Sequence, residues 1–146
     1  MPLRLLLCAA IAGLLSACTT TTVTPVDSSV DVSVVCIENN PEVVVEDFVP
    51  VLMAGLKRNG INARLVEKSD LSNSGCTNIL RYTARRTWDL KPYLRTANLQ
   101  LFSESGELLA SADYKVANGL NLGKYAGTAA KIDPLIDEVF GAQNET

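Results

Sequence analysis

VDVSVVCI, residues 30–37, is the stretch of this 146-residue chain that decides its fold. Apolar side chains occupy alternate positions from Val30 to Cys36, while Val35 and Ile37 begin to fill the second face. This pattern is typical of a strand that is covered on most of both faces. We therefore expect these residues to form the central strand of a sheet.

A helix is predicted directly after that strand. Asn40 is a favoured N-cap residue, and Pro41 suits the first helical position because it has no N–H group to leave unpaired. Apolar side chains then recur every three or four residues as far as Arg58. Pro50 lies within this pattern and should kink the helix or interrupt one hydrogen bond, and Gly60 can take the left-handed conformation that ends a helix.

Four more strands and a second helix follow from the same two periodicities. Alternating apolar residues predict strands over residues 61–67, 76–88, 93–102 and 108–116, the last two forming a hairpin. An apolar stripe over residues 125–141 predicts the second helix. The order β-α-β-β-β-β-α is typical of an α+β fold, a two-layer sandwich with both helices on one face of a mixed five-stranded sheet.

A disulfide bond is predicted between Cys36 and Cys76. They are the even pair left once Cys8 and Cys18 are assigned to the N-terminal segment, and an exported domain folds in an oxidising compartment. Cys36 lies near the end of the first predicted strand and Cys76 at the start of the third. These two positions are adjacent if the strands are antiparallel neighbours. With the second strand parallel to the first on its far side, the predicted strand order is 2-1-3-4-5. Two buried free thiols are the alternative.

Residues 1–17 are predicted to be a lipoprotein signal peptide. Arg4 supplies a positive charge, and the apolar run that follows would cover only about 16 Å as a helix, too short to span a bilayer. Its end, Leu15-Ser16-Ala17-Cys18, resembles the lipobox of bacterial lipoproteins, in which the cysteine thiol takes a diacylglyceryl group. This resemblance makes Cys18 the acylated first residue of the mature chain and the membrane its first partner. The alternative is an ordinary signal peptide cut nearby, with Cys18 an incidental thiol.

The lipobox resemblance also predicts where the protein resides. An aspartate directly after the cysteine commonly retains such lipoproteins in the inner membrane, and this chain has Thr19 there. We therefore expect the inner leaflet of the outer membrane, with the domain facing the periplasm. Residues 18–29 should form the acylated cysteine and an extended tether that reaches about 35 Å. A single α+β domain over residues 30–142 and a disordered tail over residues 143–146 complete the chain.

Composition argues against several classes of function. Loss of Arg4 with the signal peptide leaves 13 − 1 = 12 Lys+Arg against 16 Asp+Glu, so the mature chain lacks the basic excess that nucleic-acid binding needs. The sequence has no histidine, the commonest general base and zinc ligand, and no CxxC motif. We expect no metal, no cofactor and a non-catalytic binding or structural role. A small hydrolase or transferase that uses carboxylates alone is the alternative.

The most unusual local cluster joins the third and fourth strands. Its candidate partner-binding residues are Arg86, Trp88, Asp89, Lys91 and Tyr93. Aromatic and charged side chains on a rigid turn suit contact with another envelope protein or a cell-wall component. Alternatively, the aromatic rings cap the open end of the core. An ion pair of Arg85 or Arg86 with Asp89 or Glu104 would likewise be structural.

Segments spread over most of the mature chain carry a family resemblance. They are Cys36-Ile37-Glu38-Asn39-Asn40-Pro41, Asp47-Phe48-Val49-Pro50, Tyr82-Thr83-Ala84, Trp88-Asp89, Lys91-Pro92-Tyr93-Leu94 and residues 131–138. In these segments the sequence resembles the Sbal family of small proteobacterial lipoproteins. The resemblance implies a lipid-anchored envelope protein with this fold, and it assigns no activity.

Overall fold

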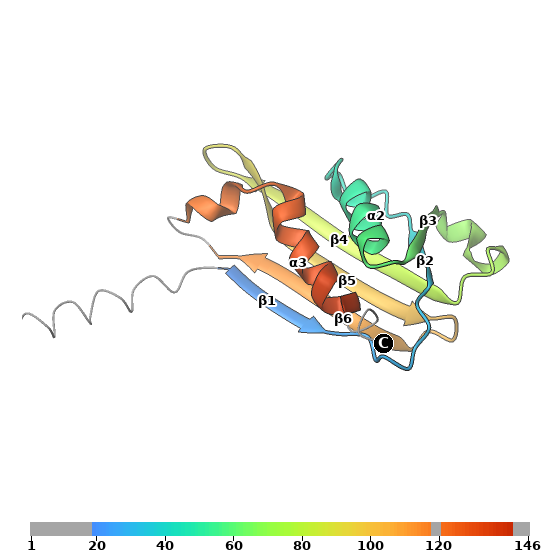
Figure 1. The fold of residues 1–146 in the computed structure, drawn as a ribbon. Coiled ribbons are helices and arrows are strands. Elements are labelled where there is room, and N and C mark those ends of the chain that lie inside the picture. The colour runs from blue at the N-terminus through green and yellow to red at the C-terminus, as the bar shows by residue number, and fades with distance from the viewer. Residues whose placement is uncertain (1–18, 118–120, 142–146) are drawn as a thin grey trace, which may run out of the picture.

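A computed structural model describes residues 19–117 and 121–141 of the chain. Its strands are β1 (Thr19–Thr24), β2 (Val34–Glu38), β3 (Asn62–Val66), β4 (Asn78–Trp88), β5 (Pro92–Ser103) and β6 (Leu108–Val116). Its helices are α2 (Phe48–Arg58) and α3 (Thr128–Phe140), with short 3₁₀ segments η2 (Lys68–Asn73) and η3 (Leu122–Tyr125). Figure 1 shows both helices over one face of the sheet, so the predicted α+β class is confirmed.

Three predictions for the ends of the chain concern residues outside those that the structure describes. These are the signal peptide over residues 1–17, the acylated Cys18 and the tail over residues 143–146. Within the described ranges, no helix combines the length and the apolar composition needed to cross a membrane.

The sheet is one strand larger than predicted. Its strand order is β1-β6-β5-β4-β2-β3, so the prediction of five strands, with the order that followed from it, is wrong. Residues Thr19–Thr24, predicted to be part of a tether, pair antiparallel with β6 and extend the sheet at that edge. The five expected strands keep the neighbours predicted for them. A run of β-branched threonines favours extended backbone, and the open edge of β6 supplies the hydrogen-bond partners.

Strands β2 and β4 are parallel, whereas the sequence predicted an antiparallel pair. The chain leaves β3, passes through η2, and enters β4 in the direction of β2, with Cys36 in register with Ile79. Cys76 lies just before β4, and its Cα atom is 5.9 Å from that of Cys36. The predicted disulfide is therefore present, although the strand direction from which it was argued is wrong.

Helix α2 begins at Phe48, later than predicted. The Asn40 side chain accepts a hydrogen bond from the Glu42 N–H at 3.1 Å, which stabilises a turn instead of a helix start. Pro50 therefore falls in the first helical turn, where its missing N–H costs no internal hydrogen bond, and the predicted kink is wrong. Pro134 does lie inside α3 and removes one hydrogen bond there.

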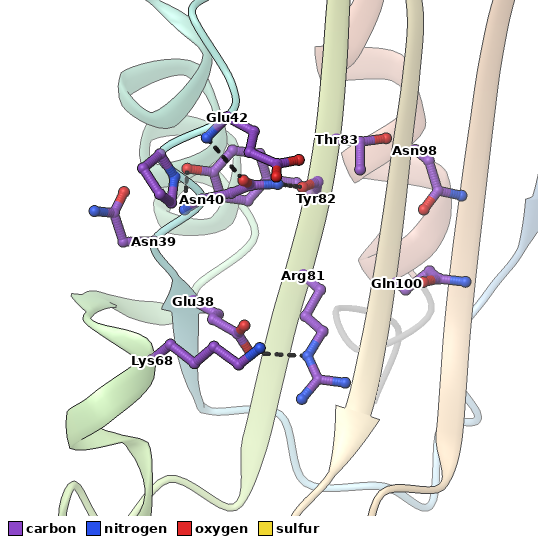
Figure 2. Close-up of a pocket in the computed structure, with 11 residues that line it drawn as sticks. Glu38, Asn39, Asn40, Glu42, Lys68, Arg81, Tyr82, Thr83, Asn98 and Gln100 are labelled. Atoms are coloured by element: carbon purple, nitrogen blue, oxygen red, sulfur yellow. Dashed lines mark hydrogen bonds and ion pairs between the residues drawn. The ribbon is translucent and has the colours of Figure 1, made fainter.

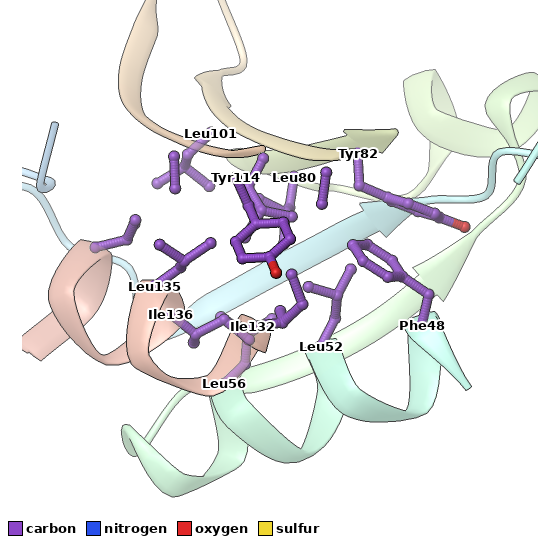
Figure 3. Packing of buried hydrophobic residues seen from close by; sticks show 14 of the residues in the cluster. Phe48, Leu52, Leu56, Leu80, Tyr82, Leu101, Tyr114, Ile132, Leu135 and Ile136 are labelled. Atoms are coloured by element: carbon purple, nitrogen blue, oxygen red, sulfur yellow. The ribbon is translucent and has the colours of Figure 1, made fainter. Parts of the chain in front are cut away.

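The helices and one face of the sheet enclose a single hydrophobic core, shown in Figure 3. Its largest side chains include Phe48, Leu52 and Leu56 of α2, Ile132, Leu135 and Ile136 of α3, and Leu80, Tyr82, Leu101 and Tyr114 of the sheet. Helices α2 and α3 approach each other at Gly55, where an added Cβ would lie 2.5 Å from Cδ1 of Ile136. Beyond β1, Val26 is buried and its N–H donates to the Val139 carbonyl at 2.9 Å.

The opposite face of the sheet carries polar side chains, and we call it the helix-free face. Thr22, Asp113, Asn98 and Thr83 stand opposite one another across β1, β6, β5 and β4. The Asn98 amide donates to the Asp113 carboxylate at 2.8 Å. This alternation of apolar inner and polar outer residues is the pattern of a sheet with one wet face.

Candidate functional site

Four strand ends meet at one end of the sheet. Strand β4 ends at Trp88 opposite the start of β5, and β6 ends at Val116 opposite Thr19, the first residue of β1. Figure 1 shows these ends on the same side of the molecule as η3. Residues from the β4–β5 connection and from η3 therefore form one continuous surface.

This surface exposes large apolar side chains. Among the described residues, four such side chains are more than 70% exposed, and three of them lie here: Trp88 at 71%, Leu90 at 85% and Leu122 at 83%. Leu90 and Leu122 line the same hollow, which has a volume of about 490 Å³. We call Trp88, Leu90 and Leu122 the apolar tip. Large contiguous apolar patches commonly mark contact surfaces, whereas apolar side chains exposed singly need no explanation.

A carboxylate at the base of the apolar tip joins its two segments. The Asp89 carboxylate accepts hydrogen bonds from the Lys124 ammonium and the Tyr125 hydroxyl, and also from the Leu90 N–H. The hydrogen bond from Lys124, followed by that from Tyr125, lowers the pKa of Asp89 from 3.8 to about 2. The pKa values of Lys124 and Tyr125 are both raised, and in each case the largest cause is the residue's own hydrogen bond to Asp89. These three residues, the Asp89 cluster, hold η3 against the β4–β5 connection.

Below the Asp89 cluster, buried side chains fix η3 to β5. Tyr93 is buried, and its ring meets that of Tyr125 edge-on with the centroids 5.7 Å apart. The buried Lys131 ammonium donates to the backbone carbonyls of Leu94, at 3.2 Å, and of Lys124. It also lies 5.7 Å from the centroid of the Tyr93 ring. Burial lowers the pKa of Lys131. The apolar tip consequently rests on a well-packed base.

The structure separates the five residues that the sequence grouped as a contact site. Trp88 and Lys91 are exposed, with the Lys91 ammonium 5.1 Å from the centroid of the Tyr125 ring. Asp89 is occupied by its cluster, and Tyr93 lies in the core, as in the core-cap alternative. Arg86 is exposed beside a β-bulge and forms its ion pair at 3.0 Å with Asp47, a partner that the sequence did not suggest.

The part of the site that η3 supplies was not predicted from the sequence. Leu122 and Lys124 lie between the last predicted strand, which ends at residue 116, and the second predicted helix, which was expected to begin at Tyr125. The sequence carried no clear signal for it, because Leu122 shares this short polar segment with Leu120 and nothing in the pattern indicates that its side chain is exposed.

A second feature opens on the helix-free face, and we call it the polar hollow. Its volume is about 440 Å³, and its lining includes Glu38, Asn39, Asn40, Arg81, Asn98 and Gln100. Figure 2 shows the Arg81 guanidinium donating to the Glu38 carboxylate at 2.8 Å. The Asn40 amide donates to the Tyr82 carbonyl at 2.9 Å, and the Asn40 N–H donates to the Tyr82 hydroxyl at 3.2 Å.

The polar hollow offers amide, carboxylate and guanidinium groups to a ligand. Residues 38–41, which follow β2, meet Tyr82 and Thr83 of β4 along it. Within the part of the chain that the structure describes, no three Cys, Asp or Glu side chains come together in a group that could hold a metal ion. The chemistry available here is hydrogen bonding to a polar partner.

Comparison with known proteins gives likeness of fold alone. No protein-family model matches the chain, and no curated protein matches it. A solved structure of a PelC variant dodecamer from Paraburkholderia phytofirmans is similar, with a TM-score of 0.57 and 15% identity over 85% of this chain and 96% of that one. A second PelC dodecamer from the same organism has a TM-score of 0.55 and 15% identity over 84% of this chain and 97% of the other.

Proposed function

We propose that this chain is a non-catalytic lipoprotein of the bacterial cell envelope, related to the Sbal lipoproteins and acylated on Cys18. The observation that carries the proposal is the lipobox-like tetrad of residues 15–18, which stands directly before the first residue of β1. A lipid on Cys18 would hold one end of the sheet at the membrane, because no flexible tether separates the cysteine from the strand. The domain would face the periplasm from the inner leaflet of the outer membrane.

The proposed role is to bind another envelope protein or a cell-wall component. The helix-free face supports it, because this face is polar, is left uncovered by the helices, and contains the polar hollow. Catalysis by carboxylates has less support. The hydrogen bonds of Asp89 keep its pKa far below neutral, and Asp137 forms an ion pair with Arg58 at 2.8 Å. A general acid or base works best with a pKa near the operating pH.

Fatty-acid labelling tests the anchor. Cells producing the parent, Cys18→Ala or Cys8→Ala chain are fed an alkyne fatty acid and then separated into soluble and membrane fractions. The parent and the Cys8→Ala control should carry label and sediment with membranes, because Cys8 leaves with the signal peptide. Cys18→Ala should lose the label and either leave the membrane fraction or remain uncleaved. A processed, unlabelled Cys18→Ala protein that stays with membranes like the parent would refute the anchor.

Photo-crosslinking in the same cells tests the binding surface. A photoreactive residue replaces Gln100, which lines the polar hollow, or Glu138, which is exposed on α3 as the matched control. The proposal expects a discrete adduct with an envelope protein or a cell-wall fragment from position 100 and none from position 138. Adducts of equal yield from both positions would contradict a dedicated binding face.

A further inference from the structure

The site of lipidation and the apolar tip lie at the same end of the domain. Cys18 precedes Thr19 in the chain, so their Cα atoms are about 3.8 Å apart. Thr19 is in register with Val116 at the end of β6, and Leu122 follows Val116 by only six residues. A lipid attached to Cys18 would therefore bring this end of the sheet, and not its opposite end, to the bilayer surface.

The chemistry of the apolar tip suits a membrane interface. Leu90 and Leu122 are among the most exposed large apolar side chains of the described residues, and transfer from water into an apolar medium favours their burial. Tryptophan is enriched at the headgroup level because its ring is apolar and its indole N–H can still meet water. Lys91 stands next to Leu90 and is exposed. A lysine in this place can bury its stem and keep its ammonium among the headgroups.

The apolar tip cannot easily withdraw into the protein. Lys124 and Tyr125 tie η3 to Asp89, while Tyr93 and Lys131 fill the space below. The side chains of the apolar tip therefore remain exposed at this end of the sheet.

We propose that Trp88, Leu90 and Leu122 insert into the bilayer that holds the acylated Cys18. This inference rests on the proposed function, because the lipid anchor is what brings the tip to the membrane. Anchor and tip together make two attachments, so the domain has a fixed orientation at the surface. The strands then run away from the membrane, and the helix-free face points sideways, accessible to a partner in the periplasm.

Trp88 is the sole tryptophan of the chain, so its fluorescence reports directly on the apolar tip. The full-length acylated protein is purified from membranes and reconstituted in vesicles of phosphatidylethanolamine and phosphatidylglycerol, either plain or brominated in the acyl chains. In plain vesicles the Trp88 emission should shift to shorter wavelength relative to the detergent-free soluble Cys18→Ala protein. In brominated vesicles most of the emission should be lost.

A second variant moves the reporter away from the membrane. Trp88→Phe combined with Phe102→Trp places the only tryptophan near the other end of β5, ten residues or about 33 Å along the strand from the partner of Trp88. Its emission should be the same in plain and brominated vesicles. Leu90→Ser with Leu122→Ser should weaken the quenching of Trp88. Leu108→Ser, which alters an exposed leucine at the opposite end of the sheet, should leave it unchanged.

Anchor and tip fail in different ways in this experiment. Full-length protein that does not float with either kind of vesicle contradicts the lipid anchor and hence the proposed function. If the protein floats but Trp88 emission has the same intensity in plain and brominated vesicles, the tip inference alone is overturned. The apolar tip would then contact a protein partner or a second copy of the chain. Quenching that survives the double serine substitution also overturns it, because nearness to the membrane would then suffice without insertion.

Discussion

Gly55→Ala should destabilise the domain although alanine is the better helix former. Gly55 lies in α2 where that helix meets α3. A methyl group there would lie 2.5 Å from Cδ1 of Ile136, 3.2 Å from its Cγ2 and 3.4 Å from its Cβ. Ile136 is fully buried, so it cannot rotate away into solvent. The helices would have to separate, or Ile136 would have to adopt an unfavourable rotamer.

Two opposing effects set the size of the change. Overpacking of a well-packed core typically costs about 1–3 kcal/mol. Replacing glycine by alanine inside a helix returns roughly 1 kcal/mol. The close contact with Ile136 places the overpacking cost at about 2–3 kcal/mol. Subtracting the gain of roughly 1 kcal/mol in helix propensity leaves an expected net loss of about 1–2 kcal/mol in the free energy of unfolding.

Urea denaturation of four proteins measures this effect: the parent, Gly55→Ala, Ile136→Val and the double variant. Ile136→Val removes Cδ1 and alone should cost about 0.5–1.5 kcal/mol. In the Gly55→Ala background the same change should cost less or stabilise, because it relieves the contact. A Gly55→Ala protein that is about 1 kcal/mol more stable than the parent, with no coupling to position 136, would refute the reasoning.

Two further predictions concern the disulfide and the Asp89 cluster. Cys36→Ala with Cys76→Ala opens a loop whose ends are 40 residues apart. The chain-entropy account predicts that the free energy of unfolding, measured by urea denaturation, falls by about 4 kcal/mol. A fall of less than about 1 kcal/mol would contradict that account. The pKa of Asp89 in the folded protein is about 2, below the ordinary value of 3.8. The carboxylate therefore stabilises the folded state at pH values above 3.8, and this stabilisation is lost as the pH falls through the folded-state pKa. The difference in unfolding free energy between the parent and Asp89→Asn should therefore shrink from about pH 5 to about pH 2, whereas a difference that is constant over this range would exclude the cluster as its cause.

The strands that the sequence predicted are those with apolar alternation. Residues 30–37 were expected to form the central strand of the sheet. The strand observed there, β2, has a neighbour on each side, but it lies next to the edge strand β3 and not at the centre of the six strands. Strand β1 was missed because its first four residues are all threonine, so no alternation distinguishes its two faces. Its partner is also distant, since Thr19 and Val116 are 116 − 19 = 97 residues apart. Local pattern cannot identify a pairing of that range.

The start of α2 was misplaced because the sequence holds two good N-terminal signals. Asn40 with Pro41 satisfies the capping preferences. Asp47, ahead of Phe48, is also a favoured N-cap residue type, although its side chain makes no capping hydrogen bond. The choice depends on Tyr82, whose carbonyl and hydroxyl take the hydrogen bonds of Asn40. Tyr82 comes 42 residues after Asn40, so tertiary structure makes this choice.

Half of the candidate site was visible in the sequence. Trp88 stood out as the only tryptophan at a strand connection, and it is exposed there. The hydrogen bonds from Lys124 and Tyr125 to Asp89 span 35 and 36 residues, and they form because the end of β4 and η3 meet at one end of the sheet. Their geometry follows from the strand order of the whole sheet, which no single segment encodes.

The placement of β1 also determines how the domain bears a mechanical load. A pull on the N-terminal end enters at Thr19 and runs along β1, whose six residues each face a partner on β6. Hydrogen bonds between antiparallel strands stand across this direction, so the force shears them together and does not peel them one by one. Behind the strand, the buried Val26 and its hydrogen bond to Val139 transfer the remaining tension to α3. With the proposed lipid on Cys18, the edge strand would act as a mechanical clamp between that attachment and the body of the domain.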